Sequence, residues 1–458
     1  MKLCVLGGGG SRSILLAKSL LQDAPSLGIN EIVFMDTNKD SLRVFGGMVL
    51  QAASLVAPKL NVSITTDPLI AVTNADFIIT TIRAGGDRER VTTERIPLAL
   101  GLLGQETTGA GGFFMALATI PTLASYCDLI RRYGKKNAMV FNFSNPSGLV
   151  TQAMWDLGHE FVYGICDAPS GFLRQIAKLR QQPLERMKMD AFGLNHLSYF
   201  TSITENDKDI TLELLEDPRL FTETDMRYFE PELPRHFGLL LNEYLYYFYY
   251  REQAIENILQ HGSTRGEEIL KTNESMYGEL SNYDPATQFD KMMNIYARYN
   301  HSREISYMSA ESSVQRSEAA APIFDFYSKD EGGYAGVALA LIRAKQTGAK
   351  GEMVLNVPNG KTALWLSEVD IVETTCTIGA HGAIPKSGMK ELPDSGKALV
   401  QAVKCYERLA VKAIRNKSMS LAAEALMVHP LVNSYSLATA LLSEYRILNP
   451  NRMEGWTT

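Results

Sequence analysis

The sequence has few cysteines and no excess of positive charge. Its 458 residues include 45 lysines and arginines against 51 aspartates and glutamates, which gives a formal net charge of -6 at pH 7. Such a chain has no basic field to attract nucleic acid or an anionic membrane surface, so neither is expected as a partner. The cysteines are odd in number and widely scattered, which argues against a disulfide framework and favours a reducing compartment. They are Cys4, Cys127, Cys166, Cys376 and Cys405.

Long hydrophobic segments are also missing. No apolar run reaches the roughly 18 residues that a membrane-spanning helix needs. The first apolar run begins at Lys2 and leaves no room for a signal peptide. We therefore expect a cytoplasmic protein without a membrane span. A hydrophobic content of 45% with 21% charged residues is ordinary for a globular enzyme, and the length favours two joined domains.

A glycine-rich loop follows the first apolar run. Gly7-Gly8-Gly9-Gly10 separates residues 2–6 from a helical pattern, an order typical of a dinucleotide-binding loop. Arg12 stands where the third glycine of G-x-G-x-x-G is usual, so the pattern alone is weak. Asp36 ends the second apolar run at the spacing of a ribose-binding carboxylate, and it favours NAD over NADP because a carboxylate repels a ribose phosphate. The residues expected to bind NAD are Gly7, Gly9, Gly10, Ser11, Asp36 and Asn145.

Apolar runs alternate with helical patterns through the first part of the chain. The expected strands are 2–6, 31–35, 62–65, 77–82, 139–143 and 161–165. This alternation predicts an α/β fold with a Rossmann-type parallel sheet and helices on both faces. We expect an NAD-binding domain at residues 1–190 and a mixed α+β domain at 191–458 for substrate binding and oligomerisation, in a homodimer or homotetramer. Ligands bind beyond the carboxyl ends of such strands, where 7–11, 83–86, 145–148 and Cys166-Asp167 fall.

Cys166 and His196 form a candidate metal site. A lone buried cysteine is usually inert packing, and a lone histidine is usually a core or surface residue. Cys166, however, ends an expected strand at the ligand edge, and His196 follows the segment Gly193-Leu194-Asn195. Two protein ligands leave positions open on a metal such as Mn²⁺, as a catalytic site that binds a substrate diol requires.

Several blocks of the sequence resemble glycoside hydrolase family 4 in order and spacing. They are Arg83-Ala84-Gly85-Gly86, Glu94-Arg95-Ile96-Pro97-Leu98, Gly104-Gln105-Glu106-Thr107-Thr108-Gly109, Asn142-Phe143-Ser144-Asn145-Pro146-Ser147-Gly148, Cys166-Asp167-Ala168-Pro169 and Gly193-Leu194-Asn195-His196. The resemblance is continuous from Met1 through the segment 404–426. This family is an exception to glycoside hydrolysis by two carboxylates because it depends on NAD.

The resemblance implies a hydrolase built on a dehydrogenase. NAD⁺ oxidises the sugar at C3, a base removes the C2 proton, the aglycone is eliminated from C1, water adds, and the hydride returns. The family's metal ligands fall on Cys166 and His196, with Mn²⁺ as the expected ion. Its base, a tyrosine, falls on Tyr244, with Tyr247 as the alternative, whereas the rest of the aromatic run is expected to pack in the core. A phenol with a pKa near 10 needs a nearby cation to act as a base, and the metal and Arg265 are the expected sources.

The substrate expected from the resemblance is a 6-phosphoglucoside. Arg90 and Arg265 match family arginines near the substrate, the Ser11 loop suits an anion, and Glu106 and Asn145 are expected to hydrogen-bond the substrate. Asp167 resembles the acid of α-specific members, or else it is a helix N-cap. The segments 107–109 and 195–198 look closer to β-specific members, so the anomer stays open.

Two other functions remain as alternatives. One is a 2-hydroxy acid dehydrogenase of the lactate or malate type, which shares the fold but needs no cysteine ligand. The other is an NAD-dependent sensor without catalysis.

Overall fold

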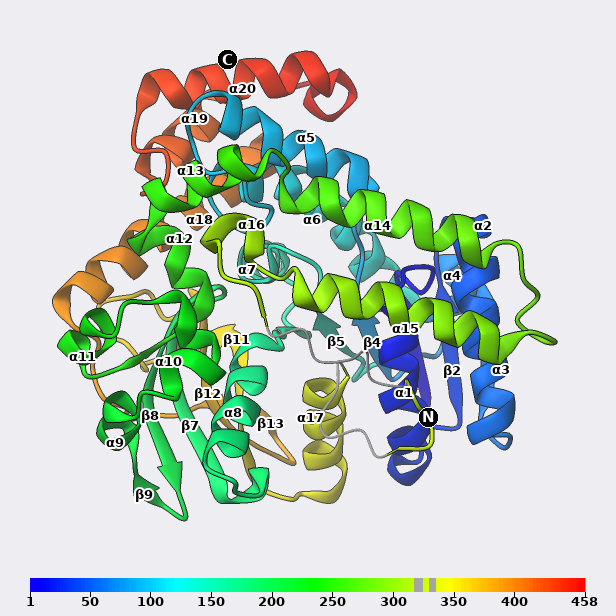
Figure 1. The fold of residues 1–458 in the computed structure, drawn as a ribbon. Coiled ribbons are helices and arrows are strands. Elements are labelled where there is room, and N and C mark those ends of the chain that lie inside the picture. Colours follow the sequence, from blue (N-terminus) through cyan, green and yellow to red (C-terminus); the bar gives the residue numbers. More distant parts are fainter. Residues whose placement is uncertain (317–323, 329–334, 458) are drawn as a thin grey trace.

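The computed structural model describes residues 1–316, 324–328 and 335–457 (Figure 1). Within them, a 13-stranded sheet runs through the molecule in the order β10-β8-β7-β12-β11-β6-β5-β4-β1-β2-β3, with β13 and β9 paired at its sides. The strands are β1 Lys2–Leu6, β2 Glu31–Met35, β3 Asn61–Thr65, β4 Phe77–Thr80, β5 Met139–Asn142, β6 Val162–Gly164, β7 Met187–Leu194, β8 Leu197–Glu205, β9 Lys208–Asp209, β10 Leu240–Leu241, β11 Gly351–Pro358, β12 Ile371–Gly379 and β13 Gly382–Pro385.

The first six strands form the predicted parallel sheet. Their spatial order β3-β2-β1-β4-β5-β6 is that of a Rossmann fold, and every pair in it is parallel. The central strands β1, β2, β4 and β5 are mainly apolar because both of their faces are covered. In β1, Cys4 and Leu6 join one hydrophobic cluster, whereas Leu3 and Val5 join the cluster on the opposite face. The predicted strands and fold class are confirmed, with differences of one or two residues at the strand ends.

The sheet continues beyond β6 with antiparallel strands from the part of the chain that follows residue 186. β11 pairs with β6 through Asn356 and Gly164, β12 pairs with β11, and β7 and β8 follow. The return of β11 and β12 to the parallel part joins the two halves in one sheet. The division into residues 1–190 and 191–458 stays a prediction.

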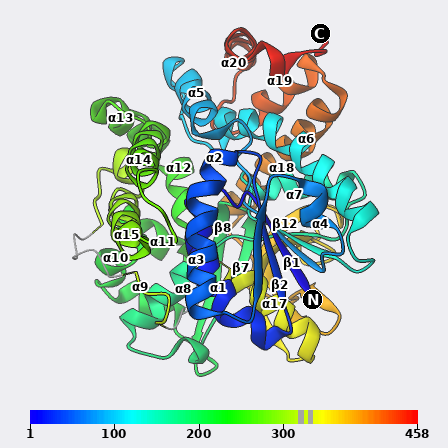
Figure 2. The same cartoon turned by 90° about the vertical axis from the view of Figure 1, so that its right-hand side faces the viewer.

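Helices cover both faces of the sheet, as two perpendicular views show (Figures 1 and 2). In the first half they are α1 Ser13–Asp23, α2 Lys39–Ser41, α3 Gly47–Val56, α4 Pro68–Val72, α5 Gly86–Ala99, α6 Gly109–Tyr133, α7 Ser147–Asp156 and α8 Ala168–Leu179. In the second half they are α9 Thr211–Glu216, α10 Leu220–Glu223, α11 Glu232–Phe237, α12 Tyr246–Tyr249, α13 Arg251–His261, α14 Arg265–Leu280, α15 Phe289–Ile305, α16 Ser309–Ser312, α17 Gly336–Thr347, α18 Asp394–Asn416, α19 Met419–Val428 and α20 Tyr435–Leu448.

Helix α6 corrects one expectation from the sequence. Among the described residues, its 25 residues are long and apolar enough to cross a membrane by length and composition alone. The helix packs instead against α5 and α7, and 61% of its apolar window is buried inside the fold. Its hydrophobicity therefore matches its place in the core.

Candidate active site

The glycine loop is hydrogen-bonded to the end of β2 just after it leaves β1. The amides of Gly7 and Gly8 both donate to the carbonyl of Met35, at 2.9 and 2.8 Å. A Cβ on Gly8 would lie 2.7 Å from the Cβ of Phe34, so a side chain at this position does not fit. Gly7 has a φ of +98°, in the left-handed region that favours glycine.

Asp36 lies at the end of β2 and faces the loop. Its Oδ2 accepts a hydrogen bond from the Gly9 amide at 2.9 Å, and its Oδ1 accepts one from the Asn38 amide, also at 2.9 Å. Both bonds hold the carboxylate at the mouth of the loop. Arg12, at the position of the usual third glycine, is the N-cap residue of α1.

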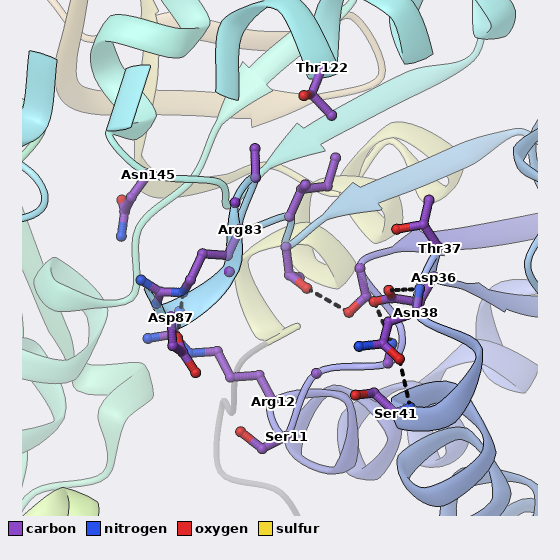
Figure 3. A pocket seen from close by; sticks show the side chains of 18 of the residues that line it. Ser11, Arg12, Asp36, Thr37, Asn38, Ser41, Arg83, Asp87, Thr122 and Asn145 are labelled. Carbon is purple, nitrogen blue, oxygen red and sulfur yellow. Dashed lines mark hydrogen bonds and ion pairs between the residues drawn. The ribbon is translucent and has the colours of Figure 1, made fainter. Parts of the chain in front are cut away.

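A cavity of about 600 Å³ opens at the carboxyl ends of the parallel strands (Figure 3). All six residues expected to bind NAD line it, together with Glu106. The structure adds lining residues that sequence reasoning missed, namely Arg83, Asn273, Arg303 and Arg452. Arg83 belongs to a block already noted after β4. The other three come from α14, α15 and the C-terminal segment, where no local motif marks them.

Glu106 is the buried acid at the inner end of this cavity. It is 7% exposed and forms ion pairs with Arg83 and, at 3.2 Å, with Arg90. Burial disfavours its charge, but Arg83, Arg90 and Arg12 outweigh that effect and lower the pKa of Glu106 to about 2. Glu106 is therefore a carboxylate at neutral pH.

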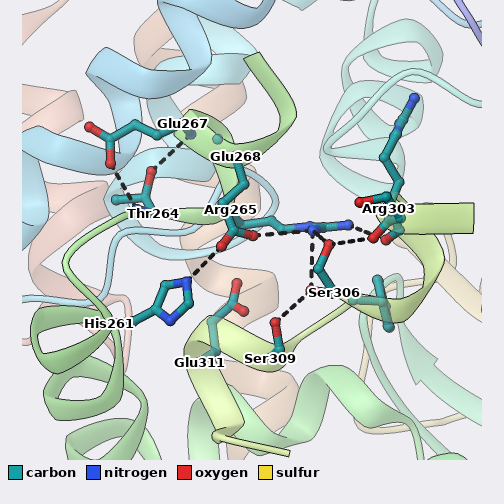
Figure 4. Close-up of polar contacts among 12 residues, drawn as sticks. His261, Thr264, Arg265, Glu267, Glu268, Arg303, Ser306, Ser309 and Glu311 are labelled. Carbon is teal, nitrogen blue, oxygen red and sulfur yellow. Dashed lines mark hydrogen bonds and ion pairs between the residues drawn. The ribbon is translucent and has the colours of Figure 1, made fainter. Parts of the chain in front are cut away.

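Arg90 and Arg265 are placed among protein partners. Arg90 donates to Glu94 at 2.8 Å in addition to its pair with Glu106. Arg265 donates to the side chain of Ser306 at 2.6 Å and to the main-chain carbonyl of Arg303 at 2.7 Å (Figure 4). Within the part of the chain that the structure describes, neither arginine is among the residues lining the cavity.

Arg303 connects this arginine cluster to the glycine loop. Its guanidinium donates to Ser11 Oγ at 2.7 Å and to Asn273 Oδ1 at 3.3 Å. Arg265 holds the main chain of Arg303, and the side chain of Arg303 contacts the glycine loop. Of Arg90, Arg265 and Arg303, Arg303 is the arginine that lines the cavity.

The structure brings Cys166 and His196 together. Cys166 follows β6, His196 lies in the turn between β7 and β8 with a φ of +62°, and Sγ and Nε2 are 3.5 Å apart. Burial lowers the pKa of His196 to about 4, so its imidazole is neutral, the form that binds metals. Burial, then the negative charges of Glu373 and Asp167, raise the pKa of the Cys166 thiol. The thiol therefore stays protonated unless a cation lies beside it.

Tyr244 lies directly against His196. The two rings stack with centroids 3.9 Å apart and planes 6° from parallel. The hydroxyls of Tyr244 and Tyr307 are hydrogen-bonded to each other, and the Tyr307 hydroxyl also lies 3.2 Å from Glu243 Oε1. Burial and the negative charge of Glu243 raise the pKa of Tyr244 well above its usual value, against the effect of the Tyr307 bond. Because Arg265 is bound elsewhere, the only expected cation left for Tyr244 is the metal.

Tyr247 lies deeper than Tyr244. Its ring centroid is 5.8 Å from that of Tyr244, and its hydroxyl donates to Glu311 Oε1 at 3.3 Å. The predicted core role for the remaining residues of the aromatic run is confirmed. Tyr246, Phe248, Tyr249 and Tyr250 all pack in or against one hydrophobic cluster.

Asp167 occupies the N-cap position of α8 but forms no side-chain cap hydrogen bond. The alternative role of Asp167 as a helix cap thus lacks the side-chain hydrogen bond to a main-chain amide that defines such a cap. Asp167 is partly exposed next to Cys166. Its carboxylate is placed beside the candidate metal ligand.

The candidate metal-ligand pair lies outside the lining of the large cavity, and Cys166 and His196 each line a smaller or separate pocket. Within the described residues, the lining of that cavity does not include Cys166, His196 or Tyr244. Glu106 connects the two regions, because its charge acts on both His196 and Tyr244. The described residues contain no cluster of three or more histidine, cysteine or acidic side chains suited to hold a metal, so Cys166 and His196 are a two-residue set.

The fold and the site together define a dinucleotide-binding protein of the dehydrogenase type with a cysteine and histidine pair at its sheet edge. Family models identify the group within that class. The model described as "Family 4 glycosyl hydrolase" matches residues 2–182, and the one described as "Family 4 glycosyl hydrolase C-terminal domain" matches residues 191–432. The chain belongs to glycosyl hydrolase family 4.

Relatives with described activities match over nearly the whole chain. A 6-phospho-beta-glucosidase of Thermotoga maritima is 29% identical over 464 residues, covering 99% of each chain. A maltose-6'-phosphate glucosidase of Clostridium acetobutylicum is 25% identical, covering 96% of each. A 6-phospho-alpha-glucosidase of Lacticaseibacillus paracasei is also 25% identical, covering 97% of this chain and 96% of its own, so relatives of both anomeric types occur.

Solved structures agree with this assignment. The T. maritima 6-phospho-beta glucosidase, solved with manganese, NAD⁺ and glucose-6-phosphate, has a TM-score of 0.81 at 28% identity over 99% of each chain. A lactate dehydrogenase from a deep-sea metagenome library has a TM-score of 0.51 at 9% identity, covering 90% of this chain and 98% of that one, and shows the shared fold alone. Family membership decides against the alternative of a 2-hydroxy acid dehydrogenase.

Proposed function

We propose that this protein hydrolyses 6-phosphoglucosides with NAD⁺ and a divalent metal ion, Mn²⁺ by preference. The observation that carries the proposal is the 3.5 Å approach of Cys166 Sγ to His196 Nε2, with Tyr244 stacked on His196 and the dinucleotide loop at the same sheet edge. The manganese, NAD⁺ and glucose-6-phosphate in the T. maritima structure support it. The relatives of both anomeric types leave the anomer open.

The residues of the site suit a metal ion. The Nδ1 atom of His196 is buried and has no hydrogen-bond partner among the described residues, while Nε2 faces the thiol of Cys166. A thiolate and an imidazole at this separation are close enough to bind one ion. When bound, the ion supplies a Lewis acid for the sugar oxygens and a positive charge beside the phenol. Cys166 and His196 hold it and leave positions for substrate.

The residues of the large cavity suit NAD⁺. The loop amides at the start of α1 bind a pyrophosphate, and Asp36 accepts hydrogen bonds from ribose hydroxyls. Asn145 lines the cavity. It follows β5, and Cys166 follows β6, the neighbouring strand of the sheet. The cofactor supplies a reversible acceptor for the hydride at C3 of the sugar.

Two side chains carry protons in the proposed reaction. Tyr244 removes the proton at C2, because its hydroxyl lies on the ring stacked against the metal ligand His196. Asp167, whose carboxylate has no capping bond, donates a proton to the leaving oxygen at C1. Tyr247 remains the alternative base.

The sugar phosphate is proposed to bind near Ser11. Ser11 and Arg303 line the cavity and contact each other at 2.7 Å, in a geometry suited to an anion. Arg265 supports this site through the main chain of Arg303, and Arg90 supports the substrate-binding Glu106. The predicted arginines therefore act mainly by positioning groups that face the cavity.

Paired substrates test the function. Nitrophenyl α- and β-glucoside 6-phosphates are incubated with the protein, NAD⁺ and Mn²⁺, and the unphosphorylated glucosides serve as controls. We expect nitrophenol release from one phosphorylated anomer without accumulation of NADH, since the hydride returns in each cycle. Accumulation of NADH in step with product would contradict a hydrolase, and absence of turnover with saturable NAD⁺ binding would support the sensor.

The assembly and location of the protein are also proposals. We propose that residues 191–458 form the substrate and oligomer-forming part of a homodimer or homotetramer in the cytoplasm. The net charge of -6 and the absence of any paired cysteine among the described residues support this location.

A further inference from the structure

Glu373 is a buried carboxylate that joins the strands around the site. It lies on β12 and is 0% exposed. Its main chain pairs with Asn356 of β11 on one side and with Gly193 of β7 on the other. A carboxylate in the middle of a sheet is costly unless its oxygens are hydrogen-bonded, so the partners of Glu373 are informative.

Three side chains donate to Glu373, each from a different element. Asn195 Nδ2 donates to Oε1 at 3.0 Å, Ser198 Oγ donates to Oε2 at 2.7 Å, and Asn356 Nδ2 donates to Oε1 at 3.5 Å. Asn195 precedes His196 in the turn between β7 and β8. Glu373 therefore fixes the side of that turn from which the imidazole projects.

A second branch of the same network leads to Tyr244. Ser198 Oγ accepts from Asn242 Nδ2 at 3.1 Å, and Asn242 Oδ1 accepts from the Tyr244 amide at 3.0 Å. Asn242 caps the short helical turn that carries Tyr244. Each group in this branch has one donor and one acceptor role, so the orientation of Ser198 depends on an acceptor at Glu373 Oε2.

The third branch reaches the strand that leads to Cys166. Asn356 packs so closely on Gly164 that a Cβ there would lie 2.6 Å from the Asn356 Cβ. Gly164 ends β6, two residues before Cys166. The amide of Asn356 that donates to Glu373 thus belongs to the residue that packs against this strand end.

We propose that Glu373 is a positioning residue that holds the two metal ligands and the base in register through Asn195, Asn356 and the Ser198–Asn242 pair. This inference rests on the proposed function, because it assigns Glu373 to the same metal site. The physical basis is the acceptor-only character of a carboxylate, which satisfies three donors from three elements at once. A glutamine there presents an NH₂ group to at least one donor, so one branch must break or rotate.

Metal affinity is the readout that a merely structural role would not move. We expect Glu373→Gln to raise the Kd for Mn²⁺ by about 10-fold, the lower end of the range for direct partners of metal ligands, because Glu373 acts through Asn195 and Asn356. With Co²⁺ as the probe, the thiolate-to-cobalt absorption band should shift or weaken. Affinity for NAD⁺ should change less than about twofold, because the glycine loop follows β1, several strands away.

Asp370→Asn is the matched control. Asp370 is a buried carboxylate just before β12, bonded to Arg408 at 2.7 Å and to the Ser367 amide at 2.8 Å. It should lower thermal stability without changing Mn²⁺ affinity or the cobalt spectrum. A Glu373→Gln protein that behaves like Asp370→Asn, with lower stability and unchanged metal binding, overturns the inference.

Single-branch variants keep the test open if Glu373→Gln does not fold. Asn195→Ala should weaken Mn²⁺ binding, whereas Asn242→Ala should lower kcat at least tenfold with Mn²⁺ affinity within about threefold of the native value. Identical effects of the two variants on metal affinity would contradict separate branches. If the native protein binds neither Mn²⁺ nor Co²⁺, the proposed metal site itself fails, and that result is distinct from failure of the Glu373 inference.

Discussion

Replacing Tyr244 with phenylalanine removes one hydroxyl and keeps the ring that stacks on His196 at 3.9 Å. The hydroxyl of Tyr307 loses one partner but still donates to Glu243 at 3.2 Å, so it is not left unpaired. Loss of one such hydrogen bond costs about 1 kcal/mol. For a chain of this size we expect Tm to fall by no more than about 2–4 °C.

The effect of Tyr244→Phe on catalysis should be much larger than its effect on folding. A general base contributes about 10² to 10⁴-fold to a rate, which corresponds to about 3–5 kcal/mol of transition-state stabilisation. We expect kcat to fall by this factor while NAD⁺ and Mn²⁺ still bind. Tyr246→Phe is the matched control, since its buried hydroxyl bonds the main-chain carbonyl of Glu311, at 3.4 Å, and the side chain of Asn257, neither of which is a proposed metal ligand or base.

The assay for this base is proton exchange at C2. In D₂O the native protein should place deuterium at C2 of the released sugar phosphate, and NMR of the product measures it against a control without enzyme. A product without deuterium refutes the elimination route, provided that the proton on the base exchanges with solvent faster than it returns to C2. An active Tyr244→Phe protein beside an inactive Tyr247→Phe protein would keep the route and move the base to Tyr247.

Three further perturbations test other parts of the site. Cys166→Ser should weaken Mn²⁺ binding, measured by calorimetry, by at least about 100-fold, the upper end of the loss seen when a residue that merely bonds a metal ligand is replaced. Unchanged Mn²⁺ affinity would exclude Cys166 as a ligand. Asp36→Ala should weaken NAD⁺ binding about 10-fold or more and reduce the preference over NADP⁺, whereas an unchanged ratio of the two affinities would refute ribose recognition by Asp36. Burial lowers the pKa of His429 to about 3, whereas the same histidine in the unfolded chain takes up a proton near pH 6.5. Protonation therefore favours the unfolded state, and the free energy of unfolding falls by about 1.4 kcal/mol per pH unit as the pH drops below about 6.5. Urea unfolding between pH 4 and 7 should show that slope reduced in His429→Gln, and equal slopes would refute a buried neutral histidine.

The parallel sheet and the cofactor loop were predictable from the sequence because their causes are local. In β1, residues 3–6 are all apolar because both faces of the strand are covered, and the glycine loop is needed where Gly8 meets Phe34. Each feature is encoded within a few residues, so pattern and spacing suffice to find it. The aspartate at the end of β2 follows from the same spacing.

The expectation that no apolar segment is long enough to span a membrane was wrong for α6, and the reason is physical. Its hydrophobicity is that of a core helix, and sequence composition does not distinguish apolar surface that faces a protein core from apolar surface that faces lipid. Packing against α5 and α7 decides between them.

By itself, the sequence determined the parallel half of the sheet and the dinucleotide loop, and it singled out Cys166 and His196 as a candidate pair. Only the tertiary structure decided which of the predicted site residues line the cavity and which act through other residues. Arg265, expected at the substrate, is bound to Ser306 and to the main chain of Arg303, and Arg303 reaches the cavity from a helix with no motif. The buried Glu373 is equally silent in the sequence. Such contacts join residues far apart along the chain, and chain packing alone brings them together.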